Sequence, residues 1–218
     1  MSHNLYREDH PLVFVITHWV NLLSMLFLIL SGFYIHFPVV PGLMGLARGT
    51  HFFWMFVLLI NLTLRIILAF IVKDANMPDT REVDTDIKNW LPQKANRHQL
   101  WPWIKYYLFL KKDHPISGKY GVLQKIAYLA TIPLTLLAAY TGFCLWGPTS
   151  DWAFFQAGTD WVASLFNAGG GGSLMPMRIL HYWTMWIILI FTFAHVYLAN
   201  IYSFAPSRMI FAWKEDIH

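Results

Sequence analysis

The sequence predicts an all-α membrane protein, a bundle of four transmembrane helices formed by one domain over residues 1–218. Apolar residues make up 56% of the chain and charged residues only 13%, whereas a soluble domain carries about 25% charged residues. Aromatic residues make up 17% of the chain. This content also indicates a membrane protein, because Trp and Tyr favour the boundary between membrane and water. Four separate apolar runs are long enough to cross a bilayer, which takes about 20 residues.

The four runs cover about residues 12–37, 51–72, 121–146 and 177–202. Lipid offers no hydrogen-bond partner, so the backbone of each run must bond internally, and each run is predicted to be a helix. Pro133 lies inside the third run and predicts a kink there.

The segments between the runs differ in charge, and this difference predicts the orientation. Nine Lys and Arg residues lie in the segment 73–120, whereas the segment 147–176 has none. Basic loops stay on the cytoplasmic side of a membrane. We therefore expect a cytoplasmic loop at 73–120, a periplasmic loop at 147–176 and both termini in the cytoplasm. The expected location is the bacterial cytoplasmic (inner) membrane, with lipid as a partner.

The periplasmic loop contains "DWAFFQAGTDWVASLF", residues 151–166, in which aromatic and aliphatic residues recur at helical intervals between acids. This pattern predicts a short helix that lies on the outer interface of the membrane. Two roles fit such a helix: an anchor in the interface, or a docking surface for a periplasmic partner.

Charge and cysteine content exclude several classes of function. A membrane surface explains the formal net charge of +4, and we expect no nucleic-acid partner. Cys144 is the single cysteine of the chain. One cysteine excludes a disulfide framework, a cysteine-rich zinc site, an iron–sulfur cluster and covalent haem attachment.

Four of the ten histidines lie within or at the edges of the apolar runs: His18, His51, His181 and His195. An ionisable side chain in a membrane span is costly and indicates a functional site, although a neutral imidazole bonded to a neighbouring helix also explains a single one. His18 and His195 lie about two turns from the cytoplasmic ends of their runs. His51 and His181 lie near the outer ends. The four histidines therefore form two levels, with two at each.

The spacing within the last run predicts what these histidines bind. His181 and His195 are 14 residues apart, which is close to four helical turns and about 21 Å, so both rings leave one face of the helix. Neutral imidazole binds iron, and the interior of a helix bundle is a common place for cofactors. Two facing imidazoles at each level would make two stacked haem b sites, with the four histidines as ligands of the haem iron.

Other residues could complete these sites. Gly32 and Gly142 could leave room for flat haem rings or could serve close packing of helices. Arg65 lies in the second run toward the cytoplasm, where it could snorkel or pair with a haem propionate. Arg178 and Arg48 lie on the outer side and could pair with the propionates of the outer haem.

Arg178, His181, Trp186, Phe191 and His195 follow one another in the last run. This pattern resembles the signature of the dihaem cytochrome b subunits of membrane-bound nickel–iron hydrogenases, in the bacterial cytochrome b561-like superfamily. "THWVNLLSMLFLILSGF", "LTLRIILAF" and "WPWIKYYLFLKK" are similar to the first helix, the end of the second helix and the cytoplasmic loop of those subunits. "GKYGVLQK", residues 118–125, resembles instead the quinone-site stretch of the gamma subunits of respiratory formate dehydrogenases.

The resemblance implies that His51 and His181 bind the outer haem, and that His18 and His195 bind the inner haem. The depths of the four histidines in the membrane predict the same two pairs. Each haem would then take one ligand from the last helix and one from an earlier helix.

The resemblance also implies a quinone, menaquinone or ubiquinone, near Gly121, Gln124 and His195. The implied function is a membrane-anchoring subunit that passes electrons to this quinone from the iron–sulfur and catalytic subunits of a periplasm-facing hydrogenase or formate dehydrogenase. This chain would hold no catalytic residue for hydrogen or formate. Two alternatives are a stand-alone cytochrome b561-type quinone or superoxide oxidoreductase and a haem-free proton-relay transporter.

Overall fold

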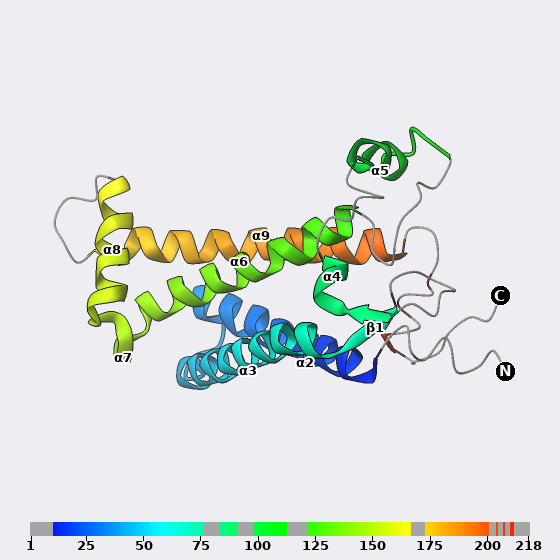
Figure 1. The fold of residues 1–218 in the computed structure, drawn as a ribbon. Helices are drawn as coiled ribbons and strands as arrows, with labels where there is room; N and C mark the ends of the chain where they lie inside the picture. Colours follow the sequence, from blue (N-terminus) through cyan, green and yellow to red (C-terminus); the bar gives the residue numbers. More distant parts are fainter. Residues whose placement is uncertain are drawn as a thin grey trace. The chain divides into compact units, whose positions relative to one another are not determined.

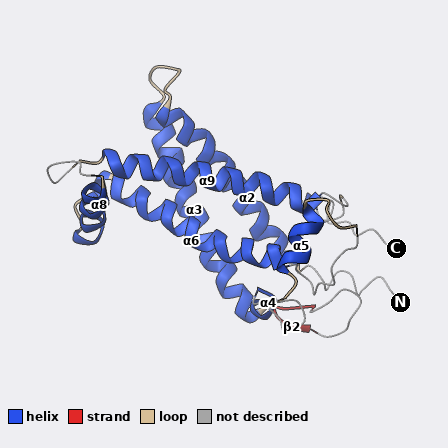
Figure 2. Cartoon of the chain, turned by 90° about the horizontal axis from the view of Figure 1, so that it is seen from above, coloured by secondary structure: helices blue, strands red, loops and turns tan. Residues whose placement is uncertain are grey.

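The structure is a computed structural model that describes residues 11–75, 83–90, 98–112, 122–166, 173–200, 204, 207 and 210–211. The described chain is almost entirely helical, with one small pair of strands (Figures 1 and 2). It divides into two compact units. The first unit comprises residues 1–129 and 198–218, and the second comprises residues 130–197.

Three helices among the described residues are long and apolar enough to cross a membrane. They are α2 (Leu12–His36), α3 (Met44–Ile71) and α9 (Met175–Asn200). Large apolar side chains are exposed on all three, among them Leu30, Ile60 and Phe193, with exposed fractions of 57%, 60% and 73%. Apolar surface of this extent requires an apolar surrounding. The chain is therefore a membrane protein, and three of the predicted spans are confirmed as candidate spans.

The third predicted span corresponds to α6 (Val122–Leu145), a helix of 24 residues. Its described apolar part, Leu129–Leu145, is shorter than a full span, so the bundle of four spans stays a prediction. Pro133 lies inside α6 without ending it.

The start of α3 differs from the prediction, which placed it at residue 51. The helix begins at Met44, because the residues before the long apolar stretch, "MGLARGT", include no proline and continue the helix outward. The chain turns just before this point at Gly42, whose φ of +87° lies in the left-handed region that favours glycine. His51 therefore lies about two turns inside α3 instead of at its first residue.

Contacts fix the register of α2 against α3 in the first unit. The rings of Phe27 and Trp54 stack with their centroids 4.6 Å apart, and the Asn61 side-chain amide donates to the Thr17 carbonyl at 2.9 Å. The pairs run in opposite order along the two helices: Ser31 with His51, Phe27 with Trp54, Thr17 with Asn61. The two helices are thus antiparallel, and a residue early in α2 lies beside one late in α3.

Short elements follow α3 in the predicted cytoplasmic loop. They are β1 (Lys73–Ala75), β2 (Val83–Thr85), α4 (Asp86–Trp90) and α5 (Leu100–Tyr107). The two strands are antiparallel, with Lys73 opposite Thr85. The Asp86 amide donates to the Val72 carbonyl at 3.2 Å, which ties the start of α4 to the end of α3.

In the second unit, α7 (Gly147–Ser150) and α8 (Ala153–Leu165) follow α6. The short helix predicted within residues 151–166 is thereby confirmed. α8 lies across the ends of α6 and α9 (Figure 1), where Val162 packs with Cys144 and Met177 in a buried cluster. Phe154 and Trp161 are exposed on α8. Interfacial helices present apolar side chains in this way.

We predict that Gly158→Ala destabilises the protein by about 1–3 kcal/mol, the range for overpacking. A Cβ at this position of α8 would overlap the Tyr140 hydroxyl and lie 2.8 Å from its Cζ, and Tyr140 donates to the Phe154 carbonyl at 3.1 Å. Gly147→Ala is the control, because a Cβ there meets nothing within 4 Å. Thermal unfolding of the purified protein measures both. Alanine favours a helix more than glycine does, so Gly158→Ala would stabilise the protein if the side chain had room. A stabilised variant would therefore contradict the described packing.

Candidate functional site

His51 of α3 is held by a serine of α2. Ser31 Oγ lies 3.0 Å from His51 Nδ1. The same hydroxyl lies 2.6 Å from the carbonyl oxygen of Phe27 and 3.2 Å from that of Leu28, both in its own helix. Ser31 is buried and His51 is half-buried, so little water competes for these bonds.

His181 of α9 is held in the same way by a threonine of α6. Thr141 Oγ1 lies 2.8 Å from His181 Nδ1, and it lies 2.8 Å from the Leu137 carbonyl and 3.0 Å from the Ala138 carbonyl. Thr141 is fully buried. Both units therefore contain a histidine whose Nδ1 contacts a hydroxyl group of a neighbouring helix.

The donors and acceptors around each hydroxyl determine which nitrogen of the neighbouring imidazole carries the proton. A hydroxyl has one proton and two lone pairs, and a carbonyl oxygen can only accept. The proton of Ser31 or Thr141 therefore goes to the carbonyl of its own helix, and the imidazole Nδ1–H donates to the hydroxyl. The lone pair of each ring then lies on Nε2, and imidazole in this state is a metal ligand.

Gly32 follows Ser31 and lies against the same imidazole. A Cβ on Gly32 would be 3.4 Å from His51 Cε1, so any side chain beyond a methyl group would meet the ring. Gly142 is likewise the residue after the hydroxyl residue, Thr141, and it is half-buried in α6. The sequence contains this pattern twice, as "SGFY" and "TGFC". Sequence reasoning noted the two glycines, and the Ser-Gly pair at Gly32, but assigned no role to either hydroxyl. The repeated hydroxyl–glycine–phenylalanine pattern is the signal that could have indicated this role.

The other two histidines lie one level away from these two. His18 is half-buried in α2, next to Thr17, whose carbonyl accepts from Asn61 of α3. Its distance from Ser31, which marks the level of His51, is 13 residues or about 20 Å of helix. On α9 the exposed His195 lies about 21 Å from His181. Each unit thus presents two histidines with nearly the same separation.

The predicted pairs stay predictions, because His18 and His51 belong to the first unit and their predicted partners belong to the second. Among the described residues, no three His, Cys, Asp or Glu side chains gather into a metal site.

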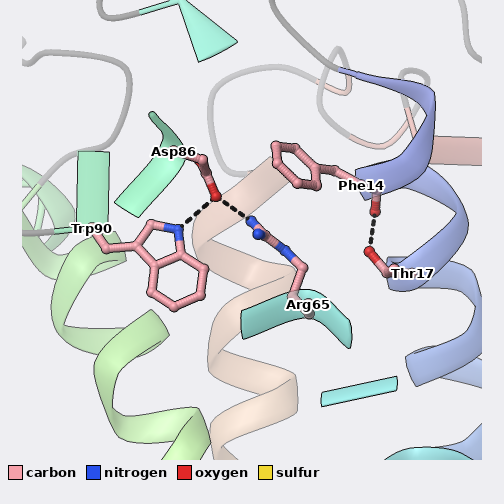
Figure 3. Close-up of polar contacts among 5 residues, drawn as sticks. All are labelled: Phe14, Thr17, Arg65, Asp86 and Trp90. Atoms are coloured by element: carbon pink, nitrogen blue, oxygen red, sulfur yellow. Dashed lines mark hydrogen bonds and ion pairs between the residues drawn. The ribbon is translucent and has the colours of Figure 1, made fainter. Parts of the chain in front are cut away.

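Arg65 has a protein partner that sequence reasoning missed. Its Nη2 forms an ion pair of 2.7 Å with Asp86 Oδ2, and the Trp90 indole donates to the same oxygen at 2.9 Å. Figure 3 shows the guanidinium between Asp86 and the Phe14 ring, 4.0 Å from the ring centroid. A lone arginine in an apolar run requires a counter-charge, but the sequence does not say which acid of the following loop supplies it.

The remaining predicted site residues are less informative. Arg178 and Arg48 are exposed at the beginnings of α9 and α3. Gln124 lies in α6, but its side chain is outside the described part of the chain, and Gly121 lies outside the described residues. The predicted quinone contacts of these two residues therefore stay predictions.

Apolar spans that contain histidines, two of them with Nδ1 on a hydroxyl of a neighbouring helix, fit an integral-membrane haem protein of the cytochrome b type. Comparison with known proteins specifies the group. The chain belongs to the prokaryotic cytochrome b561 family, whose family model matches residues 9–212.

Relatives are similar over most of the chain. A protein of Rhizobium leguminosarum bv. viciae is 32% identical over 203 residues, which cover 84% of this chain and 76% of the relative. A protein of Azotobacter chroococcum mcd 1 is 30% identical, with 84% and 75% covered. Both are named probable Ni/Fe-hydrogenase B-type cytochrome subunit. A 30% identical protein of Escherichia coli (strain K12), with 84% and 78% covered, is named probable Ni/Fe-hydrogenase 1 B-type cytochrome subunit.

We predict that Ser31→Ala and Thr141→Ala each weaken the binding of the same haem, the one held by His51 and His181, by 10- to 100-fold. This is the usual effect of losing a hydrogen bond that orients a metal ligand. Ser31→Thr and Thr141→Ser keep the hydroxyl and should retain the haem. The haem-to-protein ratio, measured during dilution or detergent washing, checks this result.

Ser24→Ala is the matched control for these variants. Ser24 is fully buried in α2 and bonds the Val20 carbonyl at 2.7 Å, and no described contact joins it to a histidine. Its loss should leave the haem content unchanged. Wild-type haem retention and wild-type electron paramagnetic resonance spectra in both alanine variants would contradict the orienting role of the hydroxyls.

Proposed function

We propose that this chain is the membrane-anchoring dihaem cytochrome b subunit of a periplasm-facing hydrogenase, and that it passes electrons to quinone near the cytoplasmic face. The relatives above carry hydrogenase names, which supports hydrogenase over formate dehydrogenase as the donor. One observation carries the proposal: each unit contains two histidines about 20 Å apart along the helices, one of them with its Nδ1 on a hydroxyl.

In this proposal α2, α3, α6 and α9 form a bundle around two haem b groups. His51 and His181 hold the outer haem, and His18 and His195 hold the inner one. A bound haem supplies a one-electron carrier. The four histidines would bind the iron through Nε2, Ser31 and Thr141 would fix the ring planes of His51 and His181, and the apolar helices would exclude water.

Charge distribution supports the proposed orientation. The basic segment 73–120 and both termini lie in the cytoplasm, and the segment 147–176, without Lys or Arg, lies in the periplasm. The periplasmic side would then receive electrons from the iron–sulfur and catalytic subunits, in the bacterial inner membrane. Menaquinone or ubiquinone would bind on the opposite side, near His195, Gln124 and Gly121.

Arginines could neutralise the haem propionates. Arg178 lies one turn before His181, at the start of α9, with an exposed side chain. We propose Arg178 as a partner for an acidic group of the outer haem, together with Arg48 at the start of α3. Arg65 was the predicted candidate on the inner side, but its charge is already paired with Asp86, so we do not include it among the propionate partners.

We predict that His51→Ala and His181→Ala each reduce the haem content from two groups per chain to one, because the loss of one axial ligand releases the haem that it holds. His98→Ala is the control, since His98 is exposed in the polar segment before α5. The pyridine haemochrome assay on the purified protein measures the ratio. A wild-type protein without haem would refute the proposed function.

We predict that gentle solubilisation of the membrane isolates this chain with a larger catalytic subunit that contains nickel. Elemental analysis of the complex distinguishes nickel from the molybdenum or tungsten of a formate dehydrogenase. Molybdenum or tungsten would transfer the proposal to formate dehydrogenase. A chain that purifies alone with both haems would favour the stand-alone cytochrome.

A further inference from the structure

The ion pair of Arg65 and Asp86 contains two polar atoms that no described residue satisfies. Arg65 Nη1 and Asp86 Oδ1 are both buried and have no hydrogen-bond partner among the described residues. Asp86 is fully buried, and the Arg65 side chain is only 16% exposed. Buried polar atoms are nearly always paired, and unpaired charged ones are the most costly. These two atoms therefore indicate a ligand.

The chemistry of the two atoms specifies the group that would pair with them. Arg65 Nη1 can only donate a hydrogen bond, and the ionised Asp86 Oδ1 can only accept one. The complementary group must accept from the guanidinium and donate to the carboxylate. A hydroxyl group does both with a single oxygen atom.

The charge of the cluster favours a neutral ligand. Arg65 and Asp86 already neutralise each other at 2.7 Å. A haem propionate would add a second carboxylate beside Asp86, and like charges in a buried site repel strongly. A neutral hydroxyl adds no charge.

Aromatic rings surround the same guanidinium. Its carbon atom lies 4.0 Å from the centroid of Phe14 and 4.9 Å from that of Trp90. Trp90 is buried, and its indole N–H is already used on Asp86, so both rings present apolar faces (Figure 3). A flat apolar ring with a hydroxyl substituent matches these surroundings.

The position of the cluster agrees with the proposed direction of electron flow. Phe14 lies one turn before His18 in α2, and Arg65 lies six residues before the end of α3. The cluster is therefore at the end of this helix pair that we place in the cytoplasm, close to the level of the inner haem ligand.

The geometry points to Arg65 and Asp86 as the binding site for the hydroxyl of a quinol head group. This inference rests on the proposed function and names two residues of the first unit as quinol ligands. A bound quinol would accept from Arg65 Nη1 and donate to Asp86 Oδ1. The oxidised quinone, whose carbonyl oxygen can only accept, would keep the bond to Arg65 alone.

Asp86→Asn tests the site in the purified haem-loaded complex. The readout is the rate at which 2,3-dimethyl-1,4-naphthoquinol reduces the haems, followed by their visible absorbance at increasing quinol concentration. Each quinol delivers two electrons, one to each haem, and releases two protons to water. We expect the half-saturating quinol concentration to rise about tenfold, the effect of losing one hydrogen bond to a charged group, while haem content and haem potentials stay unchanged.

Asp84→Asn is the matched control. Asp84 lies two residues earlier and pairs at 2.7 Å with Lys88 on the surface. The hydrogen bond from Lys88 lowers the pKa of the Asp84 carboxyl, so this variant removes an ionised carboxylate from the same segment. It should leave the half-saturating concentration unchanged. Arg65→Lys is the second test variant, because it keeps the charge opposite Asp86 but lacks the second guanidinium nitrogen, and it should raise the half-saturating concentration as well.

The outcomes separate this inference from its rivals. A shifted haem potential with an unchanged half-saturating concentration would assign Arg65 to a haem propionate and overturn the quinol site. An unchanged half-saturating quinol concentration in both Asp86→Asn and Arg65→Lys would also overturn the quinol site. Water would then be the partner of Arg65 Nη1 and Asp86 Oδ1. If quinol fails to reduce the haems of the wild-type complex, the proposed function itself fails.

Discussion

The donation of the histidine Nδ1–H to a hydroxyl is the interaction on which the candidate site depends. Ser31 lies on α2 and Thr141 on α6, and each hydroxyl donates its one proton to a carbonyl of its own helix. Each can therefore only accept from the imidazole beside it. Other serine and threonine side chains of these helices, such as Ser24, also bond a carbonyl of their own helix. Ser31 and Thr141 differ because each also contacts a histidine, and this contact leaves the lone pair of His51 and His181 on Nε2. Any cofactor bound there meets a ligand of fixed tautomer and fixed orientation.

The same requirement for paired polar groups shapes the rest of the first unit. α2 and α3 are apolar helices, and the polar side chains between them bond to each other or to backbone, as Asn61 does to the Thr17 carbonyl. These bonds fix the antiparallel register and hence the separation of His18 from His51. At the end of the pair, Arg65 is neutralised by Asp86, which reaches it from α4 because the chain folds back after the two short strands. Arg65 Nη1 and Asp86 Oδ1 keep no hydrogen-bond partner among the described residues, and the proposed quinol site rests on these two atoms.

Much of the fold follows from the sequence, and the failures have physical causes. Length and apolarity predicted α2, α3 and α9, and aromatic spacing predicted α8. The start of α3 was missed because "MGLARGT" is weakly apolar but compatible with a helix. Asp86 could not be assigned, because the charge of Arg65 does not identify its partner among several acids of the following loop. Ser31 and Thr141 received no role because the pattern "SGFY" and "TGFC" fits close helix packing equally well, and only the structure shows their contacts with histidines. The pairing of histidines between the units stays a prediction from depth and family resemblance.

The most direct measurement is the structure of the haem-loaded protein in a lipid nanodisc by cryo-electron microscopy. The account predicts two haem irons about 20 Å apart, the spacing of the histidine levels along the helices. It also predicts that Nε2 of His51 and His181 bind one iron, and that their Nδ1 atoms remain on Ser31 and Thr141. A single haem, or an iron held by two histidines of the same unit, would contradict it.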